Sequence, residues 1–162
     1  MLNIDLLFQM LLLANLVCSE SGWDKTDGKY VLVTLQNRAR NNGTSLMEEA
    51  LKPNQYSLSN CRNLKYFHLE LASSLLSGKI RVKEPPMALA THFASVTALS
   101  RPHRKCRGST VLEVWEHAGY EVAHKSKSGH VYFYPKNSRS KPGSLCPPKK
   151  VDGNEPWTDT EL

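Results

Sequence analysis

The sequence lacks most of the motifs that identify an enzyme or a metalloprotein. It has no Gly-rich phosphate-binding loop that ends in lysine, and its serines stand in no nucleophile-elbow motif. Its four cysteines show no C-x-x-C spacing, which argues against a zinc knuckle or a redox motif. It also lacks an unbroken apolar run of about eighteen residues, so no membrane span is expected. We therefore expect no enzyme activity, no metal or cofactor and no small-molecule substrate.

The composition is that of an ordinary globular protein, with 40% hydrophobic and 22% charged residues in a chain of 162. This length suits one compact domain with additional tails. The cysteines lie far apart in the sequence, and three would remain if the N-terminus were removed, an awkward number for a disulfide framework. We expect reduced thiols and an intracellular location.

The N-terminal segment, residues 1–19, has two interpretations. The apolar stretch Leu6–Val17 has the length of a signal-peptide core, and Ser19 fits the position before a cut ahead of Glu20, although no Lys or Arg precedes the stretch. Its apolar residues also recur at helical spacing, which favours a packed helix. The sequon at Asn42 is a possible glycosylation site that would fit a secreted product. Both interpretations stay open.

The following segment, residues 20–62, contains a β-branched run at Tyr30–Leu35 that predicts a strand. A short helix is expected at Leu46–Leu51. The clearest helix, Asn63–Ser77, has an asparagine at its cap position and a glycine after its end. A strand over residues 79–82 and a second helix over residues 87–99, opened by two prolines, complete this part of the prediction.

A third helix is expected from Thr110, which has capping-box spacing to Glu113. Strands at 120–124 and 130–134 then form a hairpin, in which alternation separates Val131 and Phe133 from His130, Tyr132 and Tyr134. The prediction is an α+β fold with a small three-helix core and a β-hairpin over residues 63–135. Residues 136–162 are expected to be a disordered tail, basic and then acidic.

Positive charge is concentrated in one part of the chain. Between Arg101 and Lys141, nine Lys and Arg residues stand against three acids, so this window carries the whole net charge of +6. A localised basic surface favours a polyanionic partner such as nucleic acid. The loop before the third helix and the hairpin tip are expected to form one binding platform, with these candidate residues: Arg104, Lys105, Arg107, Thr110, Lys125 and Lys127.

Two stretches resemble winged helix-turn-helix domains of the GntR type. Residues 74–80, SLLSGKI, and the following PPMALA are similar to the end of the first helix and the start of the second. Residues 109–111, 118–120 and 129–132 resemble the recognition helix and the wing. The resemblance implies a winged-helix-like DNA-binding protein that regulates transcription, with DNA favoured over RNA.

Three alternatives remain. Gly119-Tyr120 and the segment Ser128-Gly129-His130 resemble HicA-type messenger-RNA-cleaving toxins, which would make His130 a general acid or base on a ribose hydroxyl, assisted by Lys125 or Lys127. A second alternative is a small secreted, glycosylated binding protein with a cleaved signal peptide. A third is an interaction protein that presents Tyr132 and Tyr134 as an exposed patch.

Overall fold

The computed structural model describes residues 4–53, 55–58, 61–83, 85–136 and 146–148. Within these residues the chain forms a mixture of helices and strands, which confirms the α+β class. The elements in order are α1 Ile4–Ser21, α2 Lys25–Asn42, α3 Leu46–Ala50, α4 Tyr66–Leu76, a 3₁₀ helix η1 Met87–Leu89, β1 His92–Ser95, α5 Val96–Leu99, α6 Val111–His117, β2 Tyr120–Lys125 and β3 His130–Pro135.

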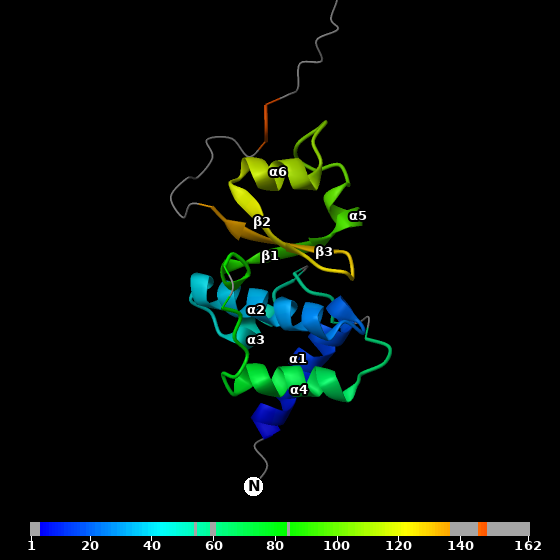
Figure 1. Ribbon diagram of the computed structural model, residues 1–162, viewed down its shortest axis with the longest axis vertical. Coiled ribbons are helices and arrows are strands. Elements are labelled where there is room, and N and C mark those ends of the chain that lie inside the picture. Colours follow the sequence, from blue (N-terminus) through cyan, green and yellow to red (C-terminus); the bar gives the residue numbers. More distant parts are fainter. Residues whose placement is uncertain (1–3, 54, 59–60, 84, 137–145, 149–162) are drawn as a thin grey trace, which may run out of the picture.

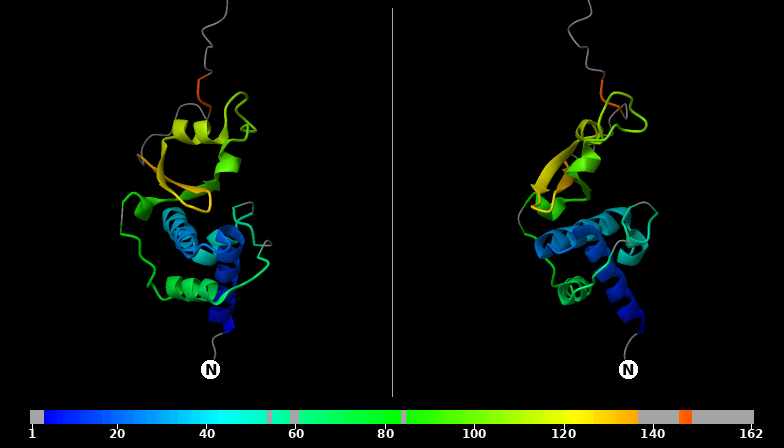
Figure 2. Two further views of the ribbon diagram at one scale, coloured as in Figure 1. Left: turned by 45° about the vertical axis from the view of Figure 1, so that its right-hand side comes forward. Right: turned by 90° about the vertical axis from the view of Figure 1, so that its right-hand side faces the viewer.

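The elements are arranged in layers. A three-stranded antiparallel sheet, in the order β1-β3-β2, lies between α6 on one side and the helices α1, α2 and α4 on the other (Figures 1 and 2). The two faces of β3 follow the predicted alternation. Val131 and Phe133 pack with Leu99 beneath α5 and α6, whereas Tyr132 packs into the larger core on the helical side.

The larger core is built where α1, α2 and α4 meet. Leu13 and Leu16 of α1 and Leu32 and Leu35 of α2 are completely buried there. The helices cross closely at Gly28, where an added Cβ would lie 2.7 Å from a methyl carbon of Val17. Glycine is therefore used at this position because the neighbouring helix leaves no room for a side chain.

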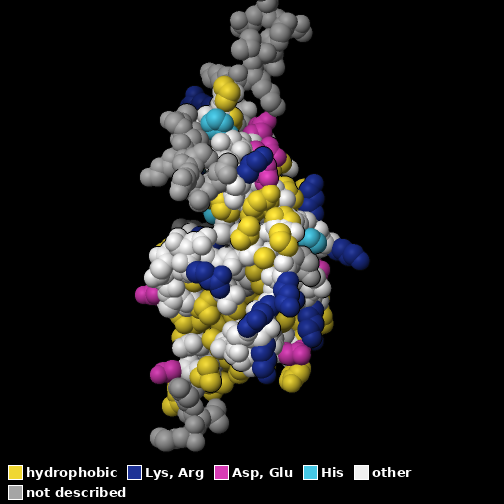
Figure 3. All heavy atoms as spheres, turned by 60° about the vertical axis from the view of Figure 1, so that its left-hand side comes forward, with side chains coloured by type: hydrophobic (Ala, Val, Ile, Leu, Met, Phe, Trp, Pro, Cys, Tyr) yellow, Lys and Arg dark blue, Asp and Glu magenta, His cyan; other side chains and the backbone are white. Residues whose placement is uncertain are grey.

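The helix α1 is divided along its length. Its last two turns are in the core, whereas Ile4, Phe8 and Leu11 in its first turns are exposed, at the end of the molecule where hydrophobic side chains are visible in Figure 3. By length and composition α1 could cross a membrane, but core helices and signal sequences pass the same test. Its buried residues all lie between Leu13 and Ser21, which fits a core helix with a projecting first half.

The expected strand at residues 30–35 is wrong, because these residues form the middle of α2. The helix begins at Asp24, whose side chain accepts a hydrogen bond from the backbone N–H of Asp27, and ends at Gly43 in the left-handed conformation. Burial of Val31, Leu32 and Leu35 between neighbouring helices outweighs the β propensity of the run.

The expected helix at residues 87–99 is also wrong. This stretch contains η1, the edge strand β1 and the single turn α5, which begins at its cap Ser95. The strand forms because residues 92–95 pair with residues 130–133 of β3, a long-range contact that local pattern does not reveal. The strand expected at 79–82 is absent, since the described residues there have no regular structure. A winged-helix fold is not confirmed.

The other expected elements are present or lie outside the described residues. The helices predicted around Asn63–Ser77, Leu46–Leu51 and Thr110 correspond to α4, α3 and α6, and the hairpin corresponds to β2 and β3. The predicted cap at Asn63 is wrong, because α4 begins two residues later, with Lys65 at its N-cap. Most of the tail predicted to be disordered, 137–145 and 149–162, falls outside the described residues.

The cysteine prediction is wrong. Cys18 is bonded to Cys61 and Cys106 to Cys146, and no free cysteine is found among the described residues. Each bond joins residues at least 40 positions apart, so sequence spacing could not show the pairing. The first bond ties the end of α1 to the segment before α4, and the second holds residue 146 against the basic loop that follows α5.

Candidate functional site

The basic loop, residues 101–110, is held in one shape although it is polar. An isolated β-bridge pairs Pro102 with Thr110, and the N–H of His103 donates to the carbonyl of Ser109 at 2.8 Å. Cys106, the only buried residue of the loop, forms the disulfide with Cys146. These bonds satisfy the loop backbone locally and leave the charged side chains in solvent.

Beside this loop lies an open groove with a volume of about 920 Å³, which we call the basic groove. It crosses β1, which is an edge strand of the sheet among the described residues, and has walls from two layers of the fold. One wall comes from α2 through Arg38, and the other comes from the basic loop and α6. The cationic side chains that line it are Arg38, Arg101, Arg104 and Lys105, and no Asp or Glu is among its described lining residues.

The groove also has aromatic walls. The ring of Trp115 lies 5.5 Å from the ring of His92 and 5.0 Å from the ring of Phe133, both in edge-to-face geometry. Burial and then the charge of Arg38 lower the pKa of His92 to about 4. His92 is therefore neutral near pH 7, and it offers a flat polar ring rather than a charge.

The cations of the groove are not equivalent. Arg38 is only 17% exposed and forms an ion pair with the buried carboxylate of Glu49 at 3.0 Å. Arg101, Arg104 and Lys105 are exposed, and no acidic partner is found for them among the described residues. Three exposed charges without an acidic partner in the described part of the chain therefore stand at the rim, next to an aromatic wall.

The structure divides the predicted binding residues between two places. Arg104 and Lys105 line the groove, and Arg107 is exposed in the same loop. Lys127 lies instead on a separate surface pocket with Ser21 and Trp23, at the hairpin tip that docks against the start of α2 (Figure 1). Lys125 is exposed at the end of β2. The loop and the hairpin tip are therefore not brought together as a single platform.

Thr110 caps the start of α6, as its spacing to Glu113 predicts. Its hydroxyl accepts from the N–H of Glu113 at 3.2 Å, and the Glu113 carboxylate accepts from the N–H of Thr110 at 2.9 Å. This capping box occupies the start of α6 with a carboxylate, which would repel a phosphate placed there. Thr110 therefore stabilises α6, and the cations of the groove lie before it.

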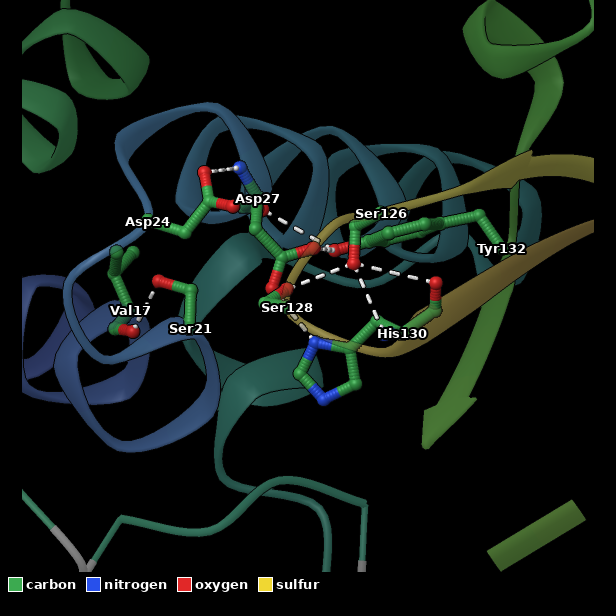
Figure 4. A network of polar contacts seen from close by, with 8 residues as sticks. All are labelled: Val17, Ser21, Asp24, Asp27, Ser126, Ser128, His130 and Tyr132. Atoms are coloured by element: carbon green, nitrogen blue, oxygen red, sulfur yellow. Dashed lines mark hydrogen bonds and ion pairs between the residues drawn. The ribbon is translucent and has the colours of Figure 1, made fainter. Parts of the chain in front are cut away.

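The hairpin tip is fixed by a buried polar network (Figure 4). Nδ1 of His130 lies 2.7 Å from one carboxylate oxygen of Asp27, and the hydroxyl of Tyr132 donates to the other at 2.6 Å. Asp27 and Tyr132 are fully buried, so the prediction of Tyr132 as an exposed partner residue is wrong. Tyr134 is half-buried and donates to Glu121 at 2.7 Å.

The network favours the ionised carboxylate of Asp27 and the protonated imidazole of His130. Burial alone would raise the pKa of Asp27, but hydrogen bonds from His130, Tyr132 and Ser128 outweigh it and lower the pKa. The hydrogen bond to Asp27 raises the pKa of His130 against the effect of burial. Burial raises the pKa of nearby Glu20, which accepts from the N–H of Ser57.

An imidazole oriented by a carboxylate is a common general base, and the RNA-cleaving alternative would use His130 in this way. His130 pairs with Asp27 of the helical layer, and it lines neither the basic groove nor the pocket beside Trp23. Of the two lysines expected to assist it, Lys127 lines the pocket beside Trp23 and Lys125 is exposed at the end of β2. The ion pair between His130 and Asp27 joins β3 to α2.

The predicted glycosylation residue Asn42 lies at the end of α2. Its side-chain amide donates to Glu49 at 3.0 Å, and the hydroxyl of Thr44 donates to the same carboxylate oxygen at 3.2 Å. Asn42 itself is exposed, and a glycosylated amide keeps one N–H that can still donate to Glu49, so the contact is compatible with a glycan.

Sequence reasoning missed Arg38, His92, Trp115 and Arg101 as groove residues. Arg38 lies more than 60 positions before the basic loop, just after the stretch at residues 30–35 that predicts a strand. The available signal was the tryptophan at position 115 next to a basic loop, since aromatic and cationic side chains together are typical of nucleic-acid binding. No protein-family model matches the chain, and no significant match is found among curated proteins or solved structures.

Proposed function

We propose that this protein binds nucleic acid, and single-stranded nucleic acid in particular, in the basic groove. The observation that carries the proposal is that three exposed cations, Arg101, Arg104 and Lys105, line one open groove together with Trp115. Phosphates need cations, and unpaired bases stack on aromatic rings whatever their sequence. Because the loop is held by a disulfide and backbone bonds, little ordering is needed when a ligand binds.

The groove alone suggests little sequence preference. Its cations would contact phosphates, and such contacts position a strand without reading its bases. A winged-helix arrangement over residues 63–135, with DNA preferred to RNA and a role in transcription, stays a prediction. The succession of α6 and the β2–β3 hairpin supports it, whereas the interruption of residues 87–99 by β1 argues against it.

The disulfides favour an oxidising compartment, because such bonds rarely persist where thiols are kept reduced. This supports the secreted alternative over the intracellular one. A cut ahead of Glu20 would remove Cys18 together with Leu13 and Leu16, which are part of the core. We therefore infer that a secreted form retains α1.

The test is the salt dependence of binding to a fluorescent single-stranded oligonucleotide, followed by anisotropy. Three phosphate contacts give a slope of about −2 in log K against log salt for a single strand. Affinity should then fall about 20-fold between 50 and 200 mM salt. Quenching of Trp115 fluorescence, absent in Trp115→Ala, should accompany binding.

The variant with Arg101, Arg104 and Lys105 all changed to Gln should lose this binding. The matched control changes Lys125 and Lys127 to Gln, which removes two exposed cations from the hairpin and should leave the salt slope unchanged. Equal binding by the triple variant would disprove the proposal. Loss of binding in the control would move the site to the hairpin. Heparin binding without Trp115 quenching would indicate a polysaccharide ligand.

A further inference from the structure

The second disulfide places Cys146 at the loop beside the groove. Cys146 is bonded to Cys106 in the basic loop, and its sulfur lies 3.6 Å from the carbonyl oxygen of Lys105. Lys105 lines the groove. Cys146 is therefore a covalent attachment point next to a groove-lining residue.

The sequence that follows has the opposite charge. Residues 151–162 contain four acids and no Lys or Arg: Asp152, Glu155, Asp159 and Glu161. They lie outside the described residues. Asp152 comes six positions after Cys146, so it can reach at most about 20 Å from the disulfide, and the later acids can reach farther. Covalent attachment at this distance corresponds to an effective concentration of order millimolar.

The groove suits such a segment in two ways. Its described lining contains four cations and no acid, so carboxylates can take the places proposed for phosphates. It also crosses β1, which pairs with β3 on one side and with no strand on the other among the described residues. A free strand edge accepts an extended peptide through backbone hydrogen bonds.

We propose that the acidic segment, residues 151–162, docks in the basic groove and competes there with nucleic acid. This inference rests on the groove described under the proposed function. Millimolar effective concentration gives substantial occupancy even for a segment whose intrinsic binding is weak. The ligand must then displace the segment, which lowers its apparent affinity.

The experiment compares the full chain with a neutral-segment variant in which Asp152→Asn, Glu155→Gln, Asp159→Asn and Glu161→Gln are combined. We expect the variant to bind the oligonucleotide about fivefold more tightly at low salt, an effect that high salt removes. A control replaces Glu116, an exposed acid of α6 outside the segment, by Gln. This variant should change the affinity by less than twofold, about the size of one screened surface charge.

A second measurement detects docking directly. A fluorescent peptide with the sequence of residues 151–162 is titrated with the neutral-segment variant, whose groove is unoccupied by its own acids. Binding of the peptide, lost when Arg101, Arg104 and Lys105 are changed to Gln in that variant, would support the proposal. Unchanged oligonucleotide affinity together with no peptide binding would overturn it. Peptide binding without any oligonucleotide binding would instead overturn the proposed function and leave docking intact.

Discussion

The buried half of α1 can be tested by comparing two substitutions in the same helix. Leu16 has no exposed surface and lies in the core between α2 and α4, whereas Phe8 is 61% exposed two turns earlier. Leu16→Ala removes buried methyl groups and leaves a cavity, at a cost of about 2–5 kcal/mol. Phe8→Ala removes mainly exposed surface and should change stability by about 0.5 kcal/mol or less.

The assay is urea unfolding followed by circular dichroism, with the disulfides intact in both variants. A domain of this size has a total stability of about 5–15 kcal/mol, so the loss expected for Leu16→Ala is a clear shift of the midpoint. A chain that begins at Glu20 loses Leu13, Leu16 and Val17 as well as the Cys18–Cys61 bond, worth about 2–4 kcal/mol by itself. It should not unfold cooperatively.

The result that would refute this reasoning is equal stability of the Leu16→Ala and Phe8→Ala variants. A chain beginning at Glu20 with a cooperative transition at the native midpoint would have the same effect. Either outcome would mean that α1 contributes no core, and the signal-peptide interpretation of residues 1–19 would then be the correct one.

Three further predictions concern local features. Gly28→Ala should lower the free energy of unfolding by about 1–3 kcal/mol, although alanine favours helix, because its Cβ would meet Val17 at 2.7 Å. Thermal unfolding measures this as a lower Tm, and an unchanged Tm would show that the helices can separate at no cost. Thr110→Ala should lower the free energy of unfolding by about 1 kcal/mol, because α6 loses its side-chain cap. The loss is measured as a lower urea midpoint, and Thr110→Ser should restore the midpoint. The pKa of His130 is raised, so its contribution to the free energy of unfolding is fully present below pH 6.5, the ordinary pKa, and is lost as the pH rises through the raised pKa. The pKa of Asp27 is lowered, so its contribution is fully present above pH 3.8, the ordinary pKa, and is lost as the pH falls through the lowered pKa. Stability against pH should therefore decline on both sides of that window, and His130→Gln should abolish the alkaline decline; an identical profile in the variant would exclude the ion pair as its cause.

Elements with complete local signals could be predicted from sequence. The capping box at Thr110 and Glu113, the glycine after α6 and the alternation along β3 were sufficient for α6 and the hairpin, because caps, turns and strand alternation depend on residues close in the chain. The helix α2 had such signals too, in Asp24 and Gly43, but its β-branched centre was given more weight. Propensity is the weaker guide when a segment is buried on several sides.

Sequence by itself determined the basic character of the region around residues 101–141, the caps of α6 and the alternation that assigns Tyr132 and Phe133 to opposite faces. Only the tertiary structure decided that β1 pairs with β3, that Cys106 meets Cys146, that Asp27 meets His130, and that Arg38 joins Arg104 at one groove. The physical reason is distance along the chain. Contacts between residues 40 or more positions apart depend on how the layers pack, and no local pattern of charge or hydrophobicity specifies that packing.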